Sequence, residues 1–274
     1  MINYPQIDPI IFALGPLKVR WYGLMYVLGF AAVYILVAYQ IRKYQLKFIK
    51  DHFEDLNFTL IIGMILGARL GYVAFYNMSY YLQHPSEIVA IWQGGMSFHG
   101  ALLGLIIANL LFCRKHDISF MKTTDLYVVT IPIGLGLGRI GNFINGELFG
   151  RVTEMPWGMV FPAAGNMPRH PSQLYECLLE GVLLFIILWA LKSAHYRFKW
   201  SSGTLFSIFL ICYGLFRSFA ELFREPDVQL GFLVGQLTMG QTLSSLMILA
   251  GITILFLNRV KKRRATATRQ EQIT

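Results

Sequence analysis

Arg139 and Arg217 are among the arginine residues that lie in or beside apolar segments of this chain, where a charged side chain needs a partner. Arg139 follows the glycine-rich apolar segment that starts at Ile133, and Arg217 lies inside a second apolar segment. An arginine in a bilayer costs roughly 3 kcal/mol or more, so its side chain should face protein, water or an anion. A guanidinium group offers a planar fork of donors that suits two oxygens of one phosphate group. Arg139 and Arg217 are therefore candidate phosphate ligands.

Arg217 belongs to a row of polar residues with helical spacing. Intervals of four, four and three residues place the row on one face of a helix, and its members are Tyr213, Arg217, Glu221 and Arg224. Arg217 and Glu221 can neutralise each other as a structural ion pair. With Arg139 at a similar depth, two arginines face one nearby acid, and the surplus positive charge favours an anion site. Both interpretations remain open from the spacing.

His99 is the candidate for proton transfer. Glycines flank it in Gly94-Gly95-Met96-Ser97-Phe98-His99-Gly100, which leaves its ring approachable, and a free imidazole titrates at roughly pH 6.5. The alternative is a hydrogen-bonded packing residue at the start of a helix. The segment approaches the Gly-x-Ser-x-Gly motif of serine hydrolases, but His99 takes the place of the second glycine, which argues against an intramembrane serine protease.

Three further charged residues in apolar segments are interpreted as supports. Glu176 and Glu180 lie about one helical turn apart, and we expect them to pair with arginines. Arg69 has no second donor beside it, so a mainly structural role is expected.

The composition is that of a membrane protein. Hydrophobic residues make up 55% of the chain and charged residues only 14%, with a mean hydropathy of +0.51, whereas about a quarter of the residues are charged in soluble proteins. The net charge of +9 comes from short basic runs between apolar segments, so no nucleic-acid partner is expected. The three cysteines show no metal-ligand spacing, so we expect neither a metal site nor a disulfide framework. The first residues contain no basic region with a small-residue cleavage site, so no cleaved signal peptide is expected.

Seven segments approach the ~20 apolar residues that a helix needs to cross a bilayer. The predicted fold is an all-α polytopic membrane protein with about seven transmembrane helices. Their approximate limits are Trp21–Gln40, Leu56–Tyr76, Gly95–Cys113, Leu126–Gly141, Gln173–Leu191, Gly203–Leu222 and Leu237–Leu257. The fourth segment is short and rich in glycine, so its ends are the hardest to define.

The basic residues of the loops predict the orientation. One side carries sixteen of them: Arg42, Lys43, Lys47, Lys50, Arg114, Lys115, Lys122, Lys192, Arg197, Lys199, Arg259, Lys261, Lys262, Arg263, Arg264 and Arg269. The other side carries five: Lys18, Arg20, Arg151, Arg169 and Arg224. Because cytoplasmic loops are enriched in lysine and arginine, the C-terminus is predicted in the cytoplasm and the N-terminus outside.

The chain is predicted to form one transmembrane catalytic domain over residues 1–260. The stretch 142–171 contains several prolines and glycines and is expected to form a small extracytoplasmic head. Residues 261–274 are expected to form a basic cytoplasmic tail, which favours anionic headgroups.

With this orientation, the polar candidates gather toward the outer ends of their spans. An anion transporter or channel of the inner membrane would also place arginines in spans, but its permeation path should carry polar residues through both leaflets. A structural membrane scaffold would not require such a cluster of donors. These two alternatives remain open at this point, and the clustering favours a site that binds a polar group near the outer surface.

Five blocks of sequence resemble bacterial prolipoprotein diacylglyceryl transferases, in the same order along the chain. They are Trp21-Tyr22-Gly23-Leu24-Met25-Tyr26, Gly94 to Gly100, Gly138-Arg139-Ile140-Gly141-Asn142-Phe143-Ile144-Asn145-Gly146-Glu147, Arg169-His170-Pro171-Ser172-Gln173-Leu174-Tyr175-Glu176 and Tyr213-Gly214-Leu215-Phe216-Arg217. The resemblance runs from about Asp8 to the last span, and the blocks together are highly specific. One departure is Ala101, where the family pattern has glycine. The added methyl group puts local packing in question rather than activity.

The resemblance implies an enzyme of the bacterial inner membrane. It implies transfer of the sn-1,2-diacylglyceryl group from phosphatidylglycerol to the lipobox cysteine thiol of a prolipoprotein signal peptide, with release of glycerol-1-phosphate, and no cofactor or metal. The implied catalytic residues are His99, Arg139 and Arg217. The implied substrate-binding residues are Arg139, Asn142, Glu147, Gly150, Tyr22, Tyr213 and Glu221.

The loop charges make a testable prediction about topology. Reporter fusions at Ser119, Tyr196 and Thr268 should report the cytoplasm, and fusions at Tyr81 and Ala164 should report the outside. Paired cytoplasmic and extracytoplasmic reporters at each position provide the measurement and its internal control. A cytoplasmic signal at Ala164 would remove the basis for a site at the outer ends of the spans.

Overall fold

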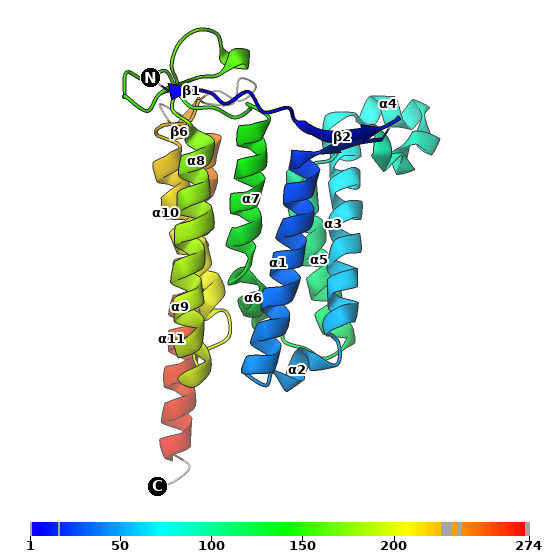
Figure 1. The fold of residues 1–274 in the computed structure, drawn as a ribbon. Helices are drawn as coiled ribbons and strands as arrows, with labels where there is room; N and C mark the ends of the chain where they lie inside the picture. Colours follow the sequence, from blue (N-terminus) through cyan, green and yellow to red (C-terminus); the bar gives the residue numbers. More distant parts are fainter. Residues whose placement is uncertain (1, 16, 226–231, 235–236, 272–274) are drawn as a thin grey trace. The chain divides into compact units, whose positions relative to one another are not determined.

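The computed structural model describes residues 2–15, 17–225, 232–234 and 237–271. Most of these residues form helices, and the strands are short (Figure 1). In the described part, five helices are long and apolar enough to cross a membrane, or up to six if a bent pair of helices is counted as one span. The predicted class, an all-α polytopic membrane protein, is confirmed.

The elements follow one another with short connections. The helices are α1 (Trp21–Lys43), α2 (Lys47–Lys50), α3 (Phe53–Tyr76), α4 (Met78–Gln83), α5 (Phe98–Lys115), α6 (Phe120–Val128), α7 (Ile131–Ile144), α8 (Ser172–Glu176), α9 (Leu184–Arg197), α10 (Thr204–Ala220) and α11 (Met239–Glu271). A π-helical turn, η4 (Cys177–Leu183), joins α8 to α9, and 3₁₀ turns form η1 (Pro85–Val89), η2 (Ile91–Gln93) and η3 (Pro162–Ala164). The strands are β1 (Ile2–Asn3), β2 (Ile10–Leu14), β3 (Leu17–Arg20), β4 (Met159–Val160), β5 (Phe232–Val234) and β6 (Leu237–Thr238).

Each of the seven predicted spans coincides largely with helix. The fourth is a pair, α6 and α7, with a 48° bend between them. Pro132 lies in the first turn of α7 and cannot continue the hydrogen bonding of a preceding helix, which explains the break. The sixth corresponds to α10, a shorter apolar helix of 17 residues. The exact number of spans and their orientation remain predictions.

The described contacts divide the chain into two compact units. Unit 1 contains Met1–Val37 and Thr124–Thr274, and unit 2 contains Ala38–Thr123. The expectation of one domain over residues 1–260 remains a prediction. Residues 1, 16, 226–231 and 235–236 of that range lie outside the described residues, as do 272–274 of the expected tail. Within that tail, α11 continues as helix through Glu271.

In unit 1, glycines let α7 approach two neighbours closely. A Cβ atom added to Gly136 would lie 3.1 Å from the Cα atom of Gly181, and one added to Gly181 would lie 2.7 Å from the Cα atom of Gly136. The backbones of α7 and η4 are therefore in direct contact. On another face of α7, a methyl group on Gly141 would lie 2.8 Å from the Tyr22 ring of α1. The glycine-rich segment is therefore a packing surface for helices on two sides.

Asp125 fixes the start of α10. Its two carboxylate oxygens accept hydrogen bonds from the backbone N–H groups of Gly203, at 2.6 Å, and Phe206, at 2.8 Å. These donors lie at the N-terminal end of the helix, where backbone N–H groups have no partner within the helix itself. Next to this cap, α10 packs against α9 and the end of α6 in a hydrophobic core formed by Val128, Val129, Leu184, Leu188 and Leu205. Cap and core together set the position of Arg217 farther along α10.

The predicted head segment is tied to the beginning of the chain. Strands β1 and β4 pair in parallel, with Ile2 opposite Met159. The hydroxyl of Tyr4 donates toward the carbonyl oxygens of Phe143, at 2.6 Å, and Ile144, at 2.9 Å, which lie at the end of α7. The beginning of the chain thus covers carbonyl groups that the last turn of α7 leaves without helical partners.

In unit 2, α3 and α5 pack through a second set of glycines. A side chain at Gly100 would lie 2.3 Å from the carbonyl oxygen of Gly67, and one at Gly104 would lie 2.1 Å from that of Gly63. Ser97 caps α5 by accepting a hydrogen bond from the Gly100 backbone. Ala101, the departure from the family pattern, lies next to this contact, and its side chain is only partly buried.

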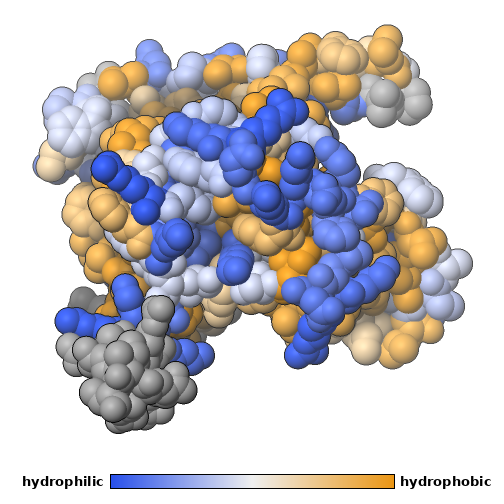
Figure 2. Space-filling model, turned by 90° about the horizontal axis from the view of Figure 1, so that it is seen from below, coloured by the Kyte–Doolittle hydropathy of each residue, from blue (hydrophilic) through white to orange (hydrophobic). Residues whose placement is uncertain are grey.

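Seen from below, the ends of the helices carry many hydrophilic side chains, which hydrophobic side chains flank (Figure 2).

The glycine contact between α3 and α5 predicts that substitution is costly at Gly100 and tolerated at Ala101. Gly100→Ala should lower the free energy of unfolding by about 1–3 kcal/mol, because the methyl group overlaps the backbone of α3. Ala101→Gly should cost no more than about 1 kcal/mol, the usual penalty of glycine within a helix. Unfolding of the detergent-solubilised protein measures both. Equal losses for the two variants would contradict the glycine contact as the feature that sets the α3–α5 distance.

Candidate functional site

A buried ionic cluster lies where α7, α8, η4 and α10 meet in unit 1. Its centre is formed by Glu176, the last residue of α8, and Glu180 in η4, and both are fully buried. Arg139 reaches them from α7 and Arg217 from α10, with Arg224 following the end of α10. The π-helical turn contains Glu180, and π-helical turns are frequent at functional sites.

Glu176 contacts all three arginines. One oxygen lies 2.6 Å from Arg139 Nε and 3.0 Å from Arg217 Nη1, and the other lies 3.2 Å from Arg224 Nη1. The Glu180 carboxylate lies 3.6 Å from Arg139 Nη2 and 3.5 Å from Arg217 Nη1. The expectation that Glu176 and Glu180 pair with arginines is confirmed.

Glu221 completes the cluster at the end of α10. It forms an ion pair with Arg217, one turn earlier, and its other oxygen accepts a hydrogen bond from the Thr238 hydroxyl at 3.0 Å. A side chain on Gly240 would overlap the Glu221 carboxylate and would displace it from its present position. Tyr213 lies near Glu180 and Arg217 and stacks on Phe209 at 5.7 Å between ring centroids. The predicted helical face of Tyr213, Arg217, Glu221 and Arg224 therefore gathers at one cluster.

The expectation that Arg139 and Arg217 face only one nearby acid is wrong. Three arginines face three carboxylates, since Glu176 and Glu180 join Glu221. The spacing along one helix located the Arg217–Glu221 pair, but it could not show that both acids of a second helix would contact the same two arginines. The formal charges of the six side chains balance, so the cluster orients its guanidinium groups instead of leaving them as free cations.

Arg139 is the most accessible arginine of the three. Its side chain is 21% exposed, compared with 13% for Arg217 and 8% for Arg224. Nε and Nη2 face the carboxylates, whereas Nη1 forms no ion pair or hydrogen bond within the described part of the chain. Arg139 can therefore offer N–H donors to a ligand while Glu176 holds its guanidinium plane in place.

Asn142 and Glu147 form a second polar group, just beyond Arg139. The Asn142 amide donates to Glu147 Oε1 at 2.8 Å, and the Asn145 amide donates to the same oxygen at 3.2 Å. The Tyr22 hydroxyl shares a hydrogen bond with that of Tyr26 at 3.1 Å and also interacts with the Asn142 side chain. Glu147 is exposed and Asn142 is buried, so the hydrogen bond between them connects a surface carboxylate to a buried amide.

Gly150 links the head to the end of α10. Its N–H donates to the His170 carbonyl at 2.8 Å, and a side chain here would lie 2.4 Å from the Phe223 carbonyl oxygen. Gly150 also pairs in a β-bridge with Arg224, the residue that reaches Glu176. Burial lowers the pKa of His170, so the ring, which lies 3.1 Å from the Tyr175 hydroxyl, is neutral near pH 7. Arg224 can therefore occupy this position only because Gly150 has no side chain.

Comparison with known proteins identifies the family. A model of the prolipoprotein diacylglyceryl transferase family matches residues 9–257. The chain belongs to the prolipoprotein diacylglyceryl transferase family. It is 59% identical over 265 residues to the phosphatidylglycerol–prolipoprotein diacylglyceryl transferase of Desulfotalea psychrophila, covering 96% of this chain and 97% of the relative. Identity to the enzyme of the same name from Geobacter sulfurreducens is 52%, covering 93% and 97%, and to that from Nitrosomonas europaea 54%, covering 93% and 91%.

Family membership makes the chain a transferase rather than a transporter. Its relatives are bacterial, and several described helices can cross a membrane by length and composition, so it is a multi-pass protein of the bacterial inner membrane.

His99 lies in unit 2, at the start of α5. Its side chain is exposed, and its ring packs edge-on against Phe98, with centroids 5.8 Å apart. In the same unit, Arg69 is buried and donates to four backbone carbonyls, those of Glu87, Ile88, Gly94 and Gly95, at 2.6–3.1 Å. These contacts are the structural role expected for Arg69, which holds the segment leading to His99.

Sequence reasoning missed two residues that support the site. Ser172 donates from its hydroxyl to the Leu148 carbonyl at 2.9 Å, and Gln173 donates from its amide to the Glu147 carbonyl at 2.7 Å. Both side chains are fully buried and fix the turn that follows α7. The sequence feature that could have identified them is the occurrence of two polar residues at the start of an apolar helix.

The geometry predicts that Glu176 dominates the stability of the cluster. Glu176→Gln should lower the free energy of unfolding by about 3–5 kcal/mol, because three guanidinium groups lose their shared buried counter-charge. The control is Glu225→Gln, which removes an exposed ion pair with Arg169 and should cost less than about 1 kcal/mol. Unfolding of both variants in detergent measures the difference. Losses of similar size would mean that Glu176 does not hold the arginines together.

Proposed function

We propose that this chain transfers the sn-1,2-diacylglyceryl group of phosphatidylglycerol to the lipobox cysteine thiol of a prolipoprotein, through a site built on Arg139 and Arg217. The thiolate sulfur attacks the sn-3 carbon of the lipid, a thioether bond forms, and the bond from that carbon to the phosphate oxygen breaks. Glycerol-1-phosphate leaves with the bonding electron pair, and the thiol proton passes to a base. The observation that carries this proposal is the pair of guanidinium groups oriented by the same buried carboxylates.

The arginines are proposed to act on the charge that develops at the phosphate. The diester carries one negative charge, and the departing monoester gains a second as the C–O bond breaks. Donors fixed before the reaction stabilise this second charge more than the ground state, which is what lowers a barrier. Arg139, the more accessible of the two, is proposed as the main headgroup ligand. Arg217 is proposed as the second contact, oriented by Glu221.

The remaining unit 1 candidates are proposed to bind or position the headgroup. Asn142 and Glu147 offer an amide and a carboxylate beyond Arg139, which suits the hydroxyl groups of a glycerol headgroup. Tyr22 packs on Gly141 and interacts with Asn142, which favours a role in orienting that amide. Tyr213 lies beside Arg217, and Gly150 is proposed to act through the position of Arg224.

His99 is proposed as the base that accepts the thiol proton, with orientation of the lipid headgroup as the rival role. The support is the family block that surrounds it, together with its exposed imidazole at the start of α5. A cysteine thiol has a pKa of roughly 8.5, so an assisting base increases the thiolate available at neutral pH.

Arginine-to-lysine substitutions test the phosphate contacts. Arg139→Lys and Arg217→Lys keep the positive charge but lose the planar fork, so each should lower the transfer rate by about a hundredfold or more. The assay follows labelled phosphatidylglycerol into a lipobox peptide on thin-layer plates. Arg42→Lys, which changes an exposed arginine in the last turn of α1, is the matched control and should stay close to wild type. Near-normal turnover by both cluster variants, once folded and inserted, would exclude geometry-specific phosphate contacts.

His99→Gln separates proton transfer from positioning. Glutamine can donate hydrogen bonds but cannot accept the thiol proton, so a base role requires a loss of orders of magnitude in rate with lipid binding retained. The measurement is the transfer rate against pH for wild type and variant together. The acid limb of the wild-type profile should vanish from the residual activity of the variant. If the same limb survives, the titrating group is another one, and His99 is a positioning residue.

A further inference from the structure

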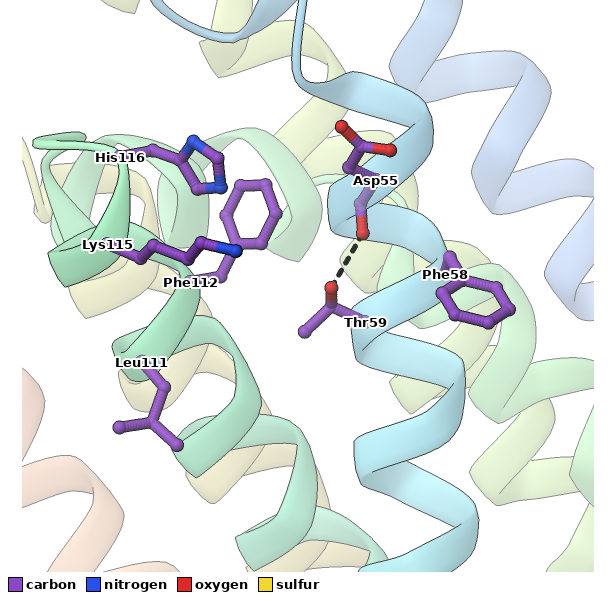
Figure 3. A pocket seen from close by; sticks show the side chains of 7 residues that line it. All are labelled: Asp55, Phe58, Thr59, Leu111, Phe112, Lys115 and His116. Atoms are coloured by element: carbon purple, nitrogen blue, oxygen red, sulfur yellow. Dashed lines mark hydrogen bonds between the residues drawn. The ribbon is translucent and has the colours of Figure 1, made fainter.

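Unit 2 contains a cavity away from all residues assigned above. It lies between the first turns of α3 and the last turns of α5 and has a volume of about 490 Å³ (Figure 3). This size falls within the range of known small-molecule sites. The end of unit 2 that holds the cavity is the one that the basic loop residues predict to be cytoplasmic.

The cavity presents two opposite charges that are not paired. Asp55 lines it from α3, and Lys115 extends toward α3 from the last turn of α5 (Figure 3). Within the described part of the chain, neither the Asp55 carboxylate nor the Lys115 ammonium group forms an ion pair or a hydrogen bond. A ligand with a single charge would be attracted by one of these groups and repelled by the other. A zwitterionic ligand would satisfy both.

The rest of the lining consists of Thr59, His116 and three apolar side chains, two of which reach the surface of the spans. Phe58 is 69% exposed and Leu111 is 58% exposed, and both lie on helices that can cross a membrane. Such side chains meet lipid acyl chains in a bilayer. His116 serves as a wall, because its ring packs against those of His52 and Phe112 with centroids 4.4 Å away in each case. The cavity therefore combines a polar end with an opening toward hydrocarbon.

We propose that this cavity binds the headgroup of a phospholipid that carries both a phosphate and a primary ammonium group, as in phosphatidylethanolamine, from the leaflet at the predicted cytoplasmic surface. Lys115 binds the phosphate as a point charge, and Asp55 accepts hydrogen bonds from the ammonium group. Phe58 and Leu111 contact the acyl chains. This lipid is distinct from the phosphatidylglycerol consumed by the transferase, so the site is independent of the proposed mechanism.

The test measures lipid binding to the full-length protein in detergent by native mass spectrometry. The probes are phosphatidylethanolamine, phosphatidylcholine, phosphatidylglycerol and the chain-free sn-glycero-3-phosphoethanolamine. Asp55→Asn and Lys115→Gln should each weaken phosphatidylethanolamine binding by about fivefold, the effect of losing one charge-assisted contact near the surface. The matched controls Asp51→Asn and Lys50→Gln change exposed charges of the same unit outside the cavity and should shift binding by less than about twofold. Transfer activity of all four variants should match wild type.

The wild-type protein provides a comparison that needs no variant to fold. Phosphatidylcholine should bind several times more weakly than phosphatidylethanolamine, because its quaternary ammonium group has no N–H to donate to Asp55. Equal binding of the two lipids, or unchanged affinity in both Asp55→Asn and Lys115→Gln, would overturn the proposal. Phosphatidylglycerol binding that strengthens in Asp55→Asn and matches phosphatidylethanolamine in wild type would make this an anionic-lipid site and overturn it as well. Equal affinity for sn-glycero-3-phosphoethanolamine would exclude a lipid as the ligand.

Discussion

The contact of one buried carboxylate, that of Glu176, with three guanidinium groups is the interaction on which the site of unit 1 depends. A carboxylate without exposure to water needs counter-charges and hydrogen-bond donors, and Arg139, Arg217 and Arg224 supply them from α7 and from the end of α10. Because each arginine shares the same acid, none can rotate away without leaving a buried charge less compensated. The helices that carry these residues are thereby held in one arrangement.

Close packing of backbones makes this contact possible. The Gly136–Gly181 approach brings α7 against η4 at a distance that only glycines allow, and Arg139 follows about one turn later on α7. At the other end, Gly150 lets the head lie against the carbonyl of Phe223 and pair with Arg224. The head is therefore more than a cover, because it fixes one of the three arginines.

The charge balance of the cluster bears on how such a site can handle phosphate. Three carboxylates offset three arginines, so the cluster cannot attract an anion through net charge alone. The cluster instead orients the guanidinium groups. The carboxylates contact Arg139 along one edge of its guanidinium plane, and its remaining N–H groups stay available on the other side. Fixed donors of this kind need no rearrangement when a charge develops, which is the basis of electrostatic stabilisation in enzymes.

The sequence by itself determined the membrane class, the approximate positions of the spans and the shared face of Tyr213, Arg217 and Glu221. These features depend on hydropathy and on the helical period, which are local properties of the chain. Only the tertiary structure decided which arginines Glu176 and Glu180 contact, that α6 and α7 bend apart before Pro132, and that Gly100 rather than Ala101 contacts α3. The physical reason is that periodicity shows which residues share a face, whereas the partner of that face is set by how closely other helices can approach.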